Sequence, residues 1–245
     1  MWKRISAFLF DAIMMFIAGV GFVFLLSLAV GFDGYVAQYD ARREAFEEMH
    51  GVSLDISSEE EYNELTEAER EIFDKAYAEF TADKEANYAF TMMFQLAIIT
   101  ITFGILFAFL ILEFAIPLIF KNGQTLGKKI FGIGIMRLDG VKVTAPFMFI
   151  RTILGKYTIE TMVPIILFIM IVFGTVGLMG PVIILLIFVM NIGMVIATRT
   201  RSPIHDMLAN TVVIDFASQM IFDTPEALLE YKQRIHAEMA EKKEY

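Results

Sequence analysis

The chain has no cysteine, and its 245 residues include only three histidines and one tryptophan. Without cysteine there can be no disulfide, no thiolate metal site and no cysteine nucleophile, and the redox compartment stays undecided. The histidines, His50, His205 and His236, lie far apart and lack the spacing of metal ligands. The sequence also shows no serine-based triad and no paired catalytic carboxylates. We therefore expect no enzymatic activity, no metal site and no cofactor.

Charge is almost absent from three long stretches of the chain. Residues 5–30 carry one charge, Asp11, residues 89–120 carry one, Glu113, and residues 161–198 carry none. Each stretch exceeds the roughly 20 residues that a helix needs to cross a bilayer. The first is also far longer than the roughly 7–15 apolar residues of a signal-peptide core. The sequence therefore predicts a multi-pass protein of the cell membrane whose first span is not cleaved.

The third apolar stretch is long enough to raise a choice between one span and two. At about 1.5 Å per residue, 38 residues are too many for one upright helix. The sequence "GTVGLMGP" at residues 174–181 holds three glycines and a proline, which favour a turn. With a third span starting near Tyr157, each arm has about 20 residues. We predict four spans, and three spans with an outside C-terminus are the alternative.

Acidic and basic side chains are segregated along the chain. Residues 32–88 hold 17 acidic and five basic side chains, a net charge of −12, whereas the whole chain carries −9. Residues 121–156 hold seven basic side chains and a single acid, Asp139. Membrane-flanking segments rich in Lys and Arg stay in the cytoplasm. We therefore expect both termini and the basic segment in the cytoplasm and the acidic insertion outside.

These patterns predict an all-α polytopic membrane protein with about four transmembrane helices, a helical extracytoplasmic insertion and a small cytoplasmic β-hairpin element. The predicted segments are a first transmembrane helix (1–31), the acidic helical insertion (32–88), a second transmembrane helix (89–120), a basic cytoplasmic loop with a hairpin and an interfacial helix (121–156), a transmembrane helical hairpin (157–198), a cytoplasmic His-Asp segment with a short strand (199–221) and a charged C-terminal helix (222–245).

Helix-capping signals support the helical insertion and the C-terminal helix. "SEEE" at residues 58–61 and "TEAE" at residues 66–69 match the capping box. No proline or glycine separates Thr66 from Gly104, which predicts one long helix leading into the second span. In the tail, Thr224 and Pro225 occupy the cap and first position of a helix.

The segment "KNGQTLGKKIFG" at residues 121–132 resembles a phosphate-binding loop only superficially. Three residues, not four, separate Gly123 from Gly127, and Lys128 is followed by a second lysine rather than a hydroxyl. We interpret it as a structural bracket in which Thr125 caps a short helix and the lysines face acidic partners or anionic lipid headgroups. Asp139-Gly140 then favours a tight turn, and the strand before it can pair with residues 211–215.

Three motifs together resemble the RDD family of small bacterial membrane proteins. They are "RISAFLFD" at residues 4–11, "GQTLGKKIFGIGI" at residues 123–135 and "IHDMLANTVV" at residues 204–213. The departures are Asn210, where the family pattern has glycine, and the long acidic insertion. The resemblance implies a compact helical membrane domain, and some members are described as cation/proton antiporters.

The two isolated acids of the apolar stretches are the candidate binding residues. Asp11 lies six residues past Ile5, and Glu113 lies seven residues before Phe120, so both are expected about 9–10 Å into the cytoplasmic leaflet. A charge facing lipid is unfavourable, so both should face the protein interior or a watery cavity. Two buried carboxylates repel each other unless a cation or a basic side chain lies between them. This is the chemistry of a coupled proton–cation site.

A purely structural interpretation of these charges is the alternative. Asp11 then pairs with Arg4, Lys128 or Arg151 and fixes helix packing, and Glu113 extends to the interface. His205-Asp206 orders a loop, or relays protons, since histidine titrates near neutrality. The predicted supporting charge network comprises Arg4, Lys128, Arg151, His205 and Asp206.

Two functions remain open from the sequence. The first is a secondary transporter of a cation or small solute, coupled to protons, with Asp11 and Glu113 as binding acids. The second is a membrane adaptor that binds partner proteins through its acidic outer helices and charged tail. Besides the lipid bilayer and anionic headgroups, the expected partners are a monovalent cation or proton and further copies of the chain, because four spans rarely enclose a transport path alone. We expect no binding to nucleic acid.

Overall fold

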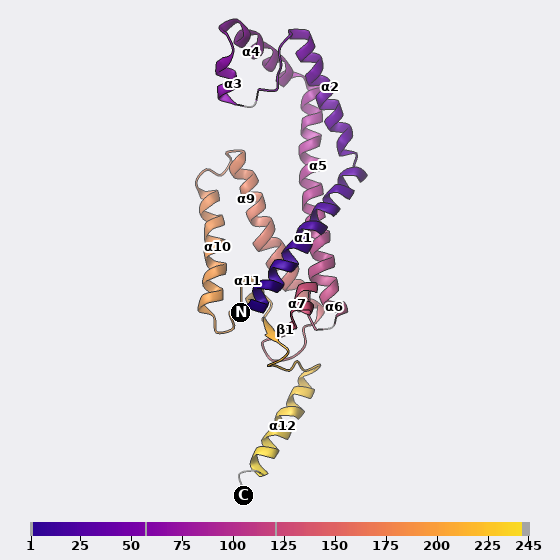
Figure 1. Ribbon diagram of the computed structural model, residues 1–245, viewed down its shortest axis with the longest axis vertical. Coiled ribbons are helices and arrows are strands. Elements are labelled where there is room, and N and C mark those ends of the chain that lie inside the picture. The colour runs from indigo at the N-terminus through magenta and orange to yellow at the C-terminus, as the bar shows by residue number, and fades with distance from the viewer. Residues whose placement is uncertain (1, 57, 121, 242–245) are drawn as a thin grey trace. The chain divides into compact units, whose positions relative to one another are not determined.

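The computed structural model describes residues 2–56, 58–120 and 122–241 (Figure 1). Lys121, which opens the predicted basic segment, and residues 242–245, which end the predicted tail helix, lie outside the described residues. The chain divides into two compact units. Unit 1 comprises residues 1–19 and 105–245, and unit 2 comprises residues 20–104.

Among the described residues, four helical segments are long and apolar enough to cross a membrane. They are α1 (Trp2–Ala29), the segment Lys84–Ile119, the segment Ala145–Val172, and α10 (Met179–Ala197). Together with a small two-stranded sheet, they confirm the predicted fold class. In unit 1, α9 (Val163–Val172) and α10 pack side by side and are joined at Gly174 and Gly177, whose positive φ angles favour glycine (Figure 1).

The helix that contains the third span begins before Tyr157. α8 (Ala145–Phe149), η2 (Ile150–Met162) and α9 form one continuous helix of 28 residues. Pro164 does not break it, because it stands in the first turn of α9, where the preceding π-helical segment changes the hydrogen-bond register. The segment predicted as an interfacial helix is therefore continuous with the helix that contains this span.

Two membrane helices contain π-helical segments, in which hydrogen bonds run from residue i to i+5. One is η2, and the other is η1 (Leu110–Ala115), which lies between α5 (Lys84–Phe109) and α6 (Ile116–Ile119). Next to them, Phe109, Tyr157 and Met162 form a buried apolar cluster in unit 1, against which Met15 of α1 packs. The π-helical segments thus lie beside a buried apolar cluster of unit 1 and contact each other.

A two-stranded antiparallel sheet joins distant parts of unit 1. β1 (Ile133–Arg137) pairs with β2 (Thr211–Asp215) from Ile133 opposite Asp215 to Arg137 opposite Thr211. The chain turns after β1 at Gly140, which has a φ of 89°, and Met136 then forms a bridge with Lys142. This confirms the predicted pairing. Two short helices flank the sheet, α7 (Leu126–Ile130) before β1 and α11 (Ile204–Leu208) before β2.

Unit 2 is helical and has its own core. It contains α2 (Phe32–His50), α3 (Glu59–Glu64), α4 (Glu67–Ala82) and much of α5. The apolar face of α4 is buried in a cluster whose most buried members are Leu54, Phe73, Ala76, Phe80 and Ala86. The predicted capping box at Thr66 and Glu69 is present, and Ser58 caps α3.

The predicted uninterrupted helix from Thr66 to Gly104 is wrong, because the chain breaks at Asp83. The backbone of Asp83 is extended, with a φ of −68° and a ψ of 128°. Its Oδ1 accepts a hydrogen bond of 2.8 Å from the backbone N–H of Ala86, so Asp83 ends α4 and caps α5. Arg42 donates to the same carboxylate, with 2.5 Å between Nη2 and Oδ2. A short polar residue can thus end a helix without glycine or proline.

The C-terminal helix α12 (Pro225–Glu241) begins as predicted. Thr224 Oγ1 accepts a hydrogen bond of 3.2 Å from the backbone N–H of Ala227. Acidic and basic side chains occur along most of the helix, and its apolar side chains Leu229 and Met239 are exposed.

Candidate functional site

Asp11 of α1 is held by the segment that the sequence singled out as a bracket. Its Oδ2 accepts a hydrogen bond from the hydroxyl of Thr125, and its Oδ1 accepts one of 2.8 Å from the backbone N–H of Gly127. The ammonium of Lys128 lies 3.5 Å from Oδ2. Thr125 also caps α7, as predicted, by accepting from the N–H of Lys128. One short turn therefore supplies all three partners of this buried carboxylate.

Gly127 is required by the close approach of α7 to α1. A Cβ atom at this position would lie 2.5 Å from the carbonyl oxygen of Ala7 and 2.9 Å from Oδ1 of Asp11. Because real Cβ atoms do not approach so closely, any side chain would push the two segments apart. The glycine of the motif thus brings a backbone donor to the carboxylate of Asp11.

Glu113 lies on η1 and is only 4 % exposed, which argues against a side chain extended to the interface. Its Oε1 accepts a hydrogen bond of 2.6 Å from Nζ of Lys156. Its Oε2 lies 3.9 Å from Nη1 of Arg151. Among the described residues, neither of these last two atoms has a hydrogen-bond partner. One oxygen of a fully buried carboxylate is therefore left unsatisfied.

The π-helical form of η2 brings both cations to Glu113. Arg151 and Lys156 are five residues apart, which would separate them by about 140° around an α-helix. In η2, where hydrogen bonds span five residues, both side chains lie close to the Glu113 carboxylate. Thr152 adds a hydrogen bond of 3.0 Å from its hydroxyl to the backbone oxygen of Glu113. The irregular helix thus creates the charge pairing.

Lys128 is a buried cation next to Asp11. Its side chain is 9 % exposed, and its Nζ donates a hydrogen bond of 3.1 Å to the hydroxyl of Thr125. Burial lowers the pKa of Lys128 to about 8, against the opposite effect of the Glu113 carboxylate, which is the strongest stabilising charge on it. Lys128 therefore interacts electrostatically with both candidate acids.

A second group of buried charges lies between η2 and α11. Arg151 donates to Asp206, with 2.6 Å between Nε and Oδ1, and its Nη2 lies 3.2 Å from Nε2 of His205. His205 Nδ1 lies 2.9 Å from the carboxylate of Glu160. An imidazole protonated on Nδ1 satisfies both contacts, since Nε2 then accepts from Arg151. The hydroxyl of Thr211 donates a hydrogen bond of 2.8 Å to Oδ1 of Asp206, which connects this group to β2.

The charges of this second group are fixed by their surroundings. Burial alone would raise the pKa of Asp206, but the Arg151 guanidinium holds it well below its usual range. Burial and the same guanidinium lower the pKa of His205 and favour its neutral form. Of the two predicted roles, this geometry fits the ordering of a segment.

Arg4 does not pair with a carboxylate of the site. Its guanidinium donates to the backbone oxygens of Val213 and of Thr200, the latter at 3.3 Å. It therefore fastens the start of α1 to β2. Of the three partners considered for Asp11, namely Arg4, Lys128 and Arg151, the structure selects Lys128.

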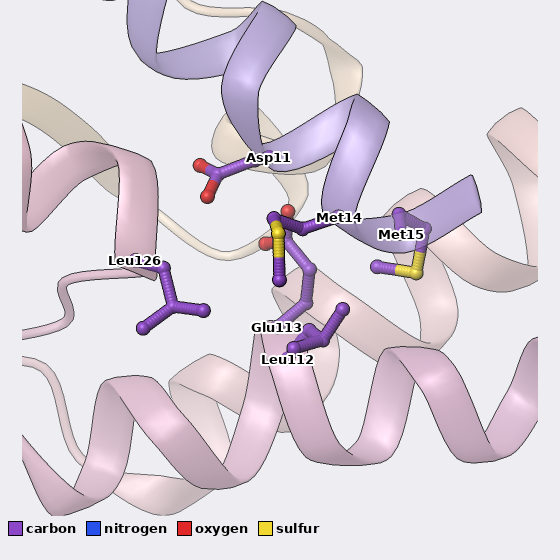
Figure 2. Close-up of a pocket in the computed structure, with 6 residues that line it drawn as sticks. All are labelled: Asp11, Met14, Met15, Leu112, Glu113 and Leu126. Carbon is purple, nitrogen blue, oxygen red and sulfur yellow. The ribbon is translucent and has the colours of Figure 1, made fainter. Parts of the chain in front are cut away.

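Asp11 and Glu113 line the same small pocket. Figure 2 shows the acids facing it from α1 and η1, with Met14, Met15 and Leu112 around them and Leu126 of α7 at its side. Its enclosed space corresponds to about one water molecule. The described residues contain no group of three or more His, Asp and Glu side chains placed to hold a metal ion.

The sequence reasoning missed Lys156 and Glu160. Both stand just before the third apolar stretch, and neither was assigned to the site. Their spacing to Arg151 gives no common α-helical face, so only a π-helical period would have grouped Arg151 with Lys156. The role of Thr125 as a partner of Asp11 was likewise missed, although its role as a cap was predicted.

The fold and the site define a polytopic helical membrane protein with a buried cluster of paired charges at those ends of its helices that are predicted to face the cytoplasm. The model of the RDD family matches residues 1–210, and the chain belongs to this family. No curated protein and no solved structure matches the chain. The matched range includes each acid and base of the cluster.

Proposed function

We propose that the protein is a secondary transporter of a cation or small solute, in which Asp11 and Glu113 are the binding acids. The observation that carries this proposal is the pocket that both acids line, together with the unsatisfied Oε2 of Glu113. A buried polar atom without a partner costs about 1–3 kcal/mol. A bound cation, or a solute that donates a hydrogen bond, would satisfy this oxygen.

The charge balance at the pocket supports coupled rather than simple binding. Asp11 and Glu113 face Lys128 and Lys156, so two negative charges meet two positive ones. An added cation must therefore be offset, either by the loss of a proton or by the withdrawal of a resident ammonium group. Both routes link binding to a second event, as an exchanger requires.

Flux measurements test the proposal directly. The purified protein is reconstituted in proteoliposomes, and uptake of Na⁺, K⁺ and small polar solutes is recorded with and without a pH gradient. We expect uptake of at least one substrate that responds to the gradient. Because four spans rarely enclose a transport path alone, we expect the active form to be a homo-oligomer. Absence of flux for the whole panel would rule out the proposed transport of these substrates.

An adaptor function is the second candidate, and unit 2 is the observation that favours it. This unit has its own apolar core and comes from the most acidic part of the chain, so it can present a fixed acidic surface to a partner. The exposed helix α12 offers a second such element. A well-folded protein that transports none of the panel would favour this function.

A further inference from the structure

Lys128 is the cation nearest to the carboxylate of Asp11. Its long side chain has many rotamers, whereas its backbone is held by hydrogen bonds. The backbone of α7 is fixed by the hydrogen bond from Gly127 to Asp11 and by the cap at Thr125. The ammonium, by contrast, reaches Asp11 only at 3.5 Å and is fastened by one hydrogen bond of 3.1 Å to Thr125. It is thus the weakest-held partner of this carboxylate.

We propose that the ammonium of Lys128 is a tethered competitor that occupies the cation position beside Asp11 and must withdraw before a small monovalent cation can bind there. This inference rests on the proposed transport function and adds to it the residue that sets cation affinity. The ligand class follows from the chemistry, because the position already stabilises one monovalent cation. An ion that takes the place of a single ammonium group must be small, and the pocket beside Asp11 adds space for only about one water molecule.

Two features of the site explain why substitution of Lys128 should leave the Asp11 carboxylate in place. Asp11 keeps two donors, the hydroxyl of Thr125 and the N–H of Gly127, neither of which depends on the lysine side chain. Glu113, whose Oε2 has no hydrogen-bond partner among the described residues, lines a pocket together with Asp11. Removing the ammonium therefore leaves a carboxylate that is still held in place and whose charge is no longer neutralised.

The test compares cation binding by Lys128→Met with that by the wild type. The full-length protein is titrated in detergent with NaCl or KCl against choline chloride at constant ionic strength, and the melting temperature is followed. Choline controls for salt effects because it is too large for the pocket. We expect Lys128→Met to respond at a Na⁺ or K⁺ concentration at least about tenfold lower than the wild type. The matched control is Lys129→Met, since Lys129 is exposed and lies over the ring of Phe120, with 3.7 Å between Nζ and the ring centroid.

A second variant keeps the test decisive if Lys128→Met folds poorly. Lys128→Gln also removes the charge but keeps a polar side chain for Thr125, and it should show the same gain. Lys128→Arg keeps the charge and should bind no better than the wild type. Equal or weaker binding by the neutral variants, or a similar gain in Lys129→Met, would overturn the proposal.

Flux through the same variants separates this inference from the proposed function. If the wild type shows no flux but the neutral variants bind the cation more tightly, the competitor role stands and transport is excluded. If the wild type transports a cation and the neutral variants show an unchanged half-saturation concentration, transport stands and the competitor role is excluded. No binding and no flux in any variant would exclude both.

Discussion

At the residue scale, the two candidate acids are held in different ways. All three partners of Asp11 come from one turn. They are the hydroxyl of Thr125, the backbone N–H of Gly127 and the ammonium of Lys128. Glu113 depends on the side chains of Lys156 and Arg151 and keeps one unsatisfied oxygen. Asp11 therefore contributes more to the packing of α1 against α7, and Glu113 is better placed to exchange its partner for a ligand.

The first prediction separates binding from packing at these acids. Asp11→Asn and Glu113→Gln should each abolish flux, because each removes a charge from the pocket while keeping the shape of the side chain. Asp11→Asn should also lower the melting temperature more, since removing one partner of a buried ion pair costs about 3–5 kcal/mol. Lys156 can turn towards water after Glu113→Gln, because its side chain is 15 % exposed.

The control for this comparison is Glu160→Gln, which alters a partly buried acid that does not line the pocket. We expect this variant to show the same flux per folded protein as the wild type. Full transport by a stable variant carrying both Asp11→Asn and Glu113→Gln would eliminate the two acids as binding residues.

The second prediction concerns the close approach at Gly127. Gly127→Ala should destabilise the protein by about 1–3 kcal/mol, because its methyl group would overlap the backbone of Ala7. Gly193→Ala in α10 is the matched control, since no atom lies within 4 Å of its Cβ position, and alanine there should be neutral or slightly stabilising. Thermal melting in detergent measures both. Equal melting temperatures for the two variants would show that α7 does not pack against α1 in this way.

At the element scale, the sequence was informative where charge and capping decide the structure. Apolar runs located the spans, and the hydroxyls of Thr66, Thr125 and Thr224 marked true helix starts. It was uninformative where the helix period changes. The π-helical segments have no signature in propensity, so neither the pairing of Lys156 with Glu113 nor the single helix from Ala145 to Val172 could be predicted.

The break at Asp83 is a second feature that the sequence did not predict. Asp83 stands inside an otherwise helical pattern without glycine or proline, and the structure identifies it as a cap because its carboxylate accepts hydrogen bonds from the N–H of Ala86 and from Arg42. The strand pairing, by contrast, was predictable because Asp139-Gly140 defines a turn and few other segments of unit 1 have strand character.

The third prediction tests the register of β1 and β2. Met136 and Val212 are directly opposed, whereas Ile214 lies two residues further along β2. Cysteines at 136 and 212 should form an intrachain disulfide under mild oxidation, because opposed residues of antiparallel strands have Cα atoms about 4.5–5.5 Å apart. Cysteines at 136 and 214 should not. Since the natural chain has no cysteine, mass spectrometry of linked peptides gives an unambiguous result. A link between 136 and 214 alone would indicate a shifted register.

At the scale of the whole molecule, charge is separated more strongly than composition suggests. The residues of unit 2 carry a net charge of −12, which exceeds the −9 of the whole chain, and unit 1 contains the basic segment and the cluster of buried charges. Two candidate spans, α1 and Lys84–Ile119, carry the chain between the acidic and the basic regions. The acidic region between two spans has few of the basic residues that keep a loop in the cytoplasm. The predicted membrane orientation therefore rests on the sequence rather than on packing.

The last prediction tests this orientation in intact cells with a membrane-impermeant maleimide. Ser58→Cys places a thiol in the acidic insertion, and Leu138→Cys places one at the exposed turn after β1. We expect the reagent to label Ser58→Cys from outside and Leu138→Cys only after the membrane is permeabilised, because the seven basic side chains of residues 121–156 hold that segment in the cytoplasm. The parent chain has no cysteine and supplies the blank. Labelling of Leu138→Cys alone from outside would reverse the orientation. Labelling of both in intact cells would mean that the two regions share one side, and the two crossings between them would then be wrong.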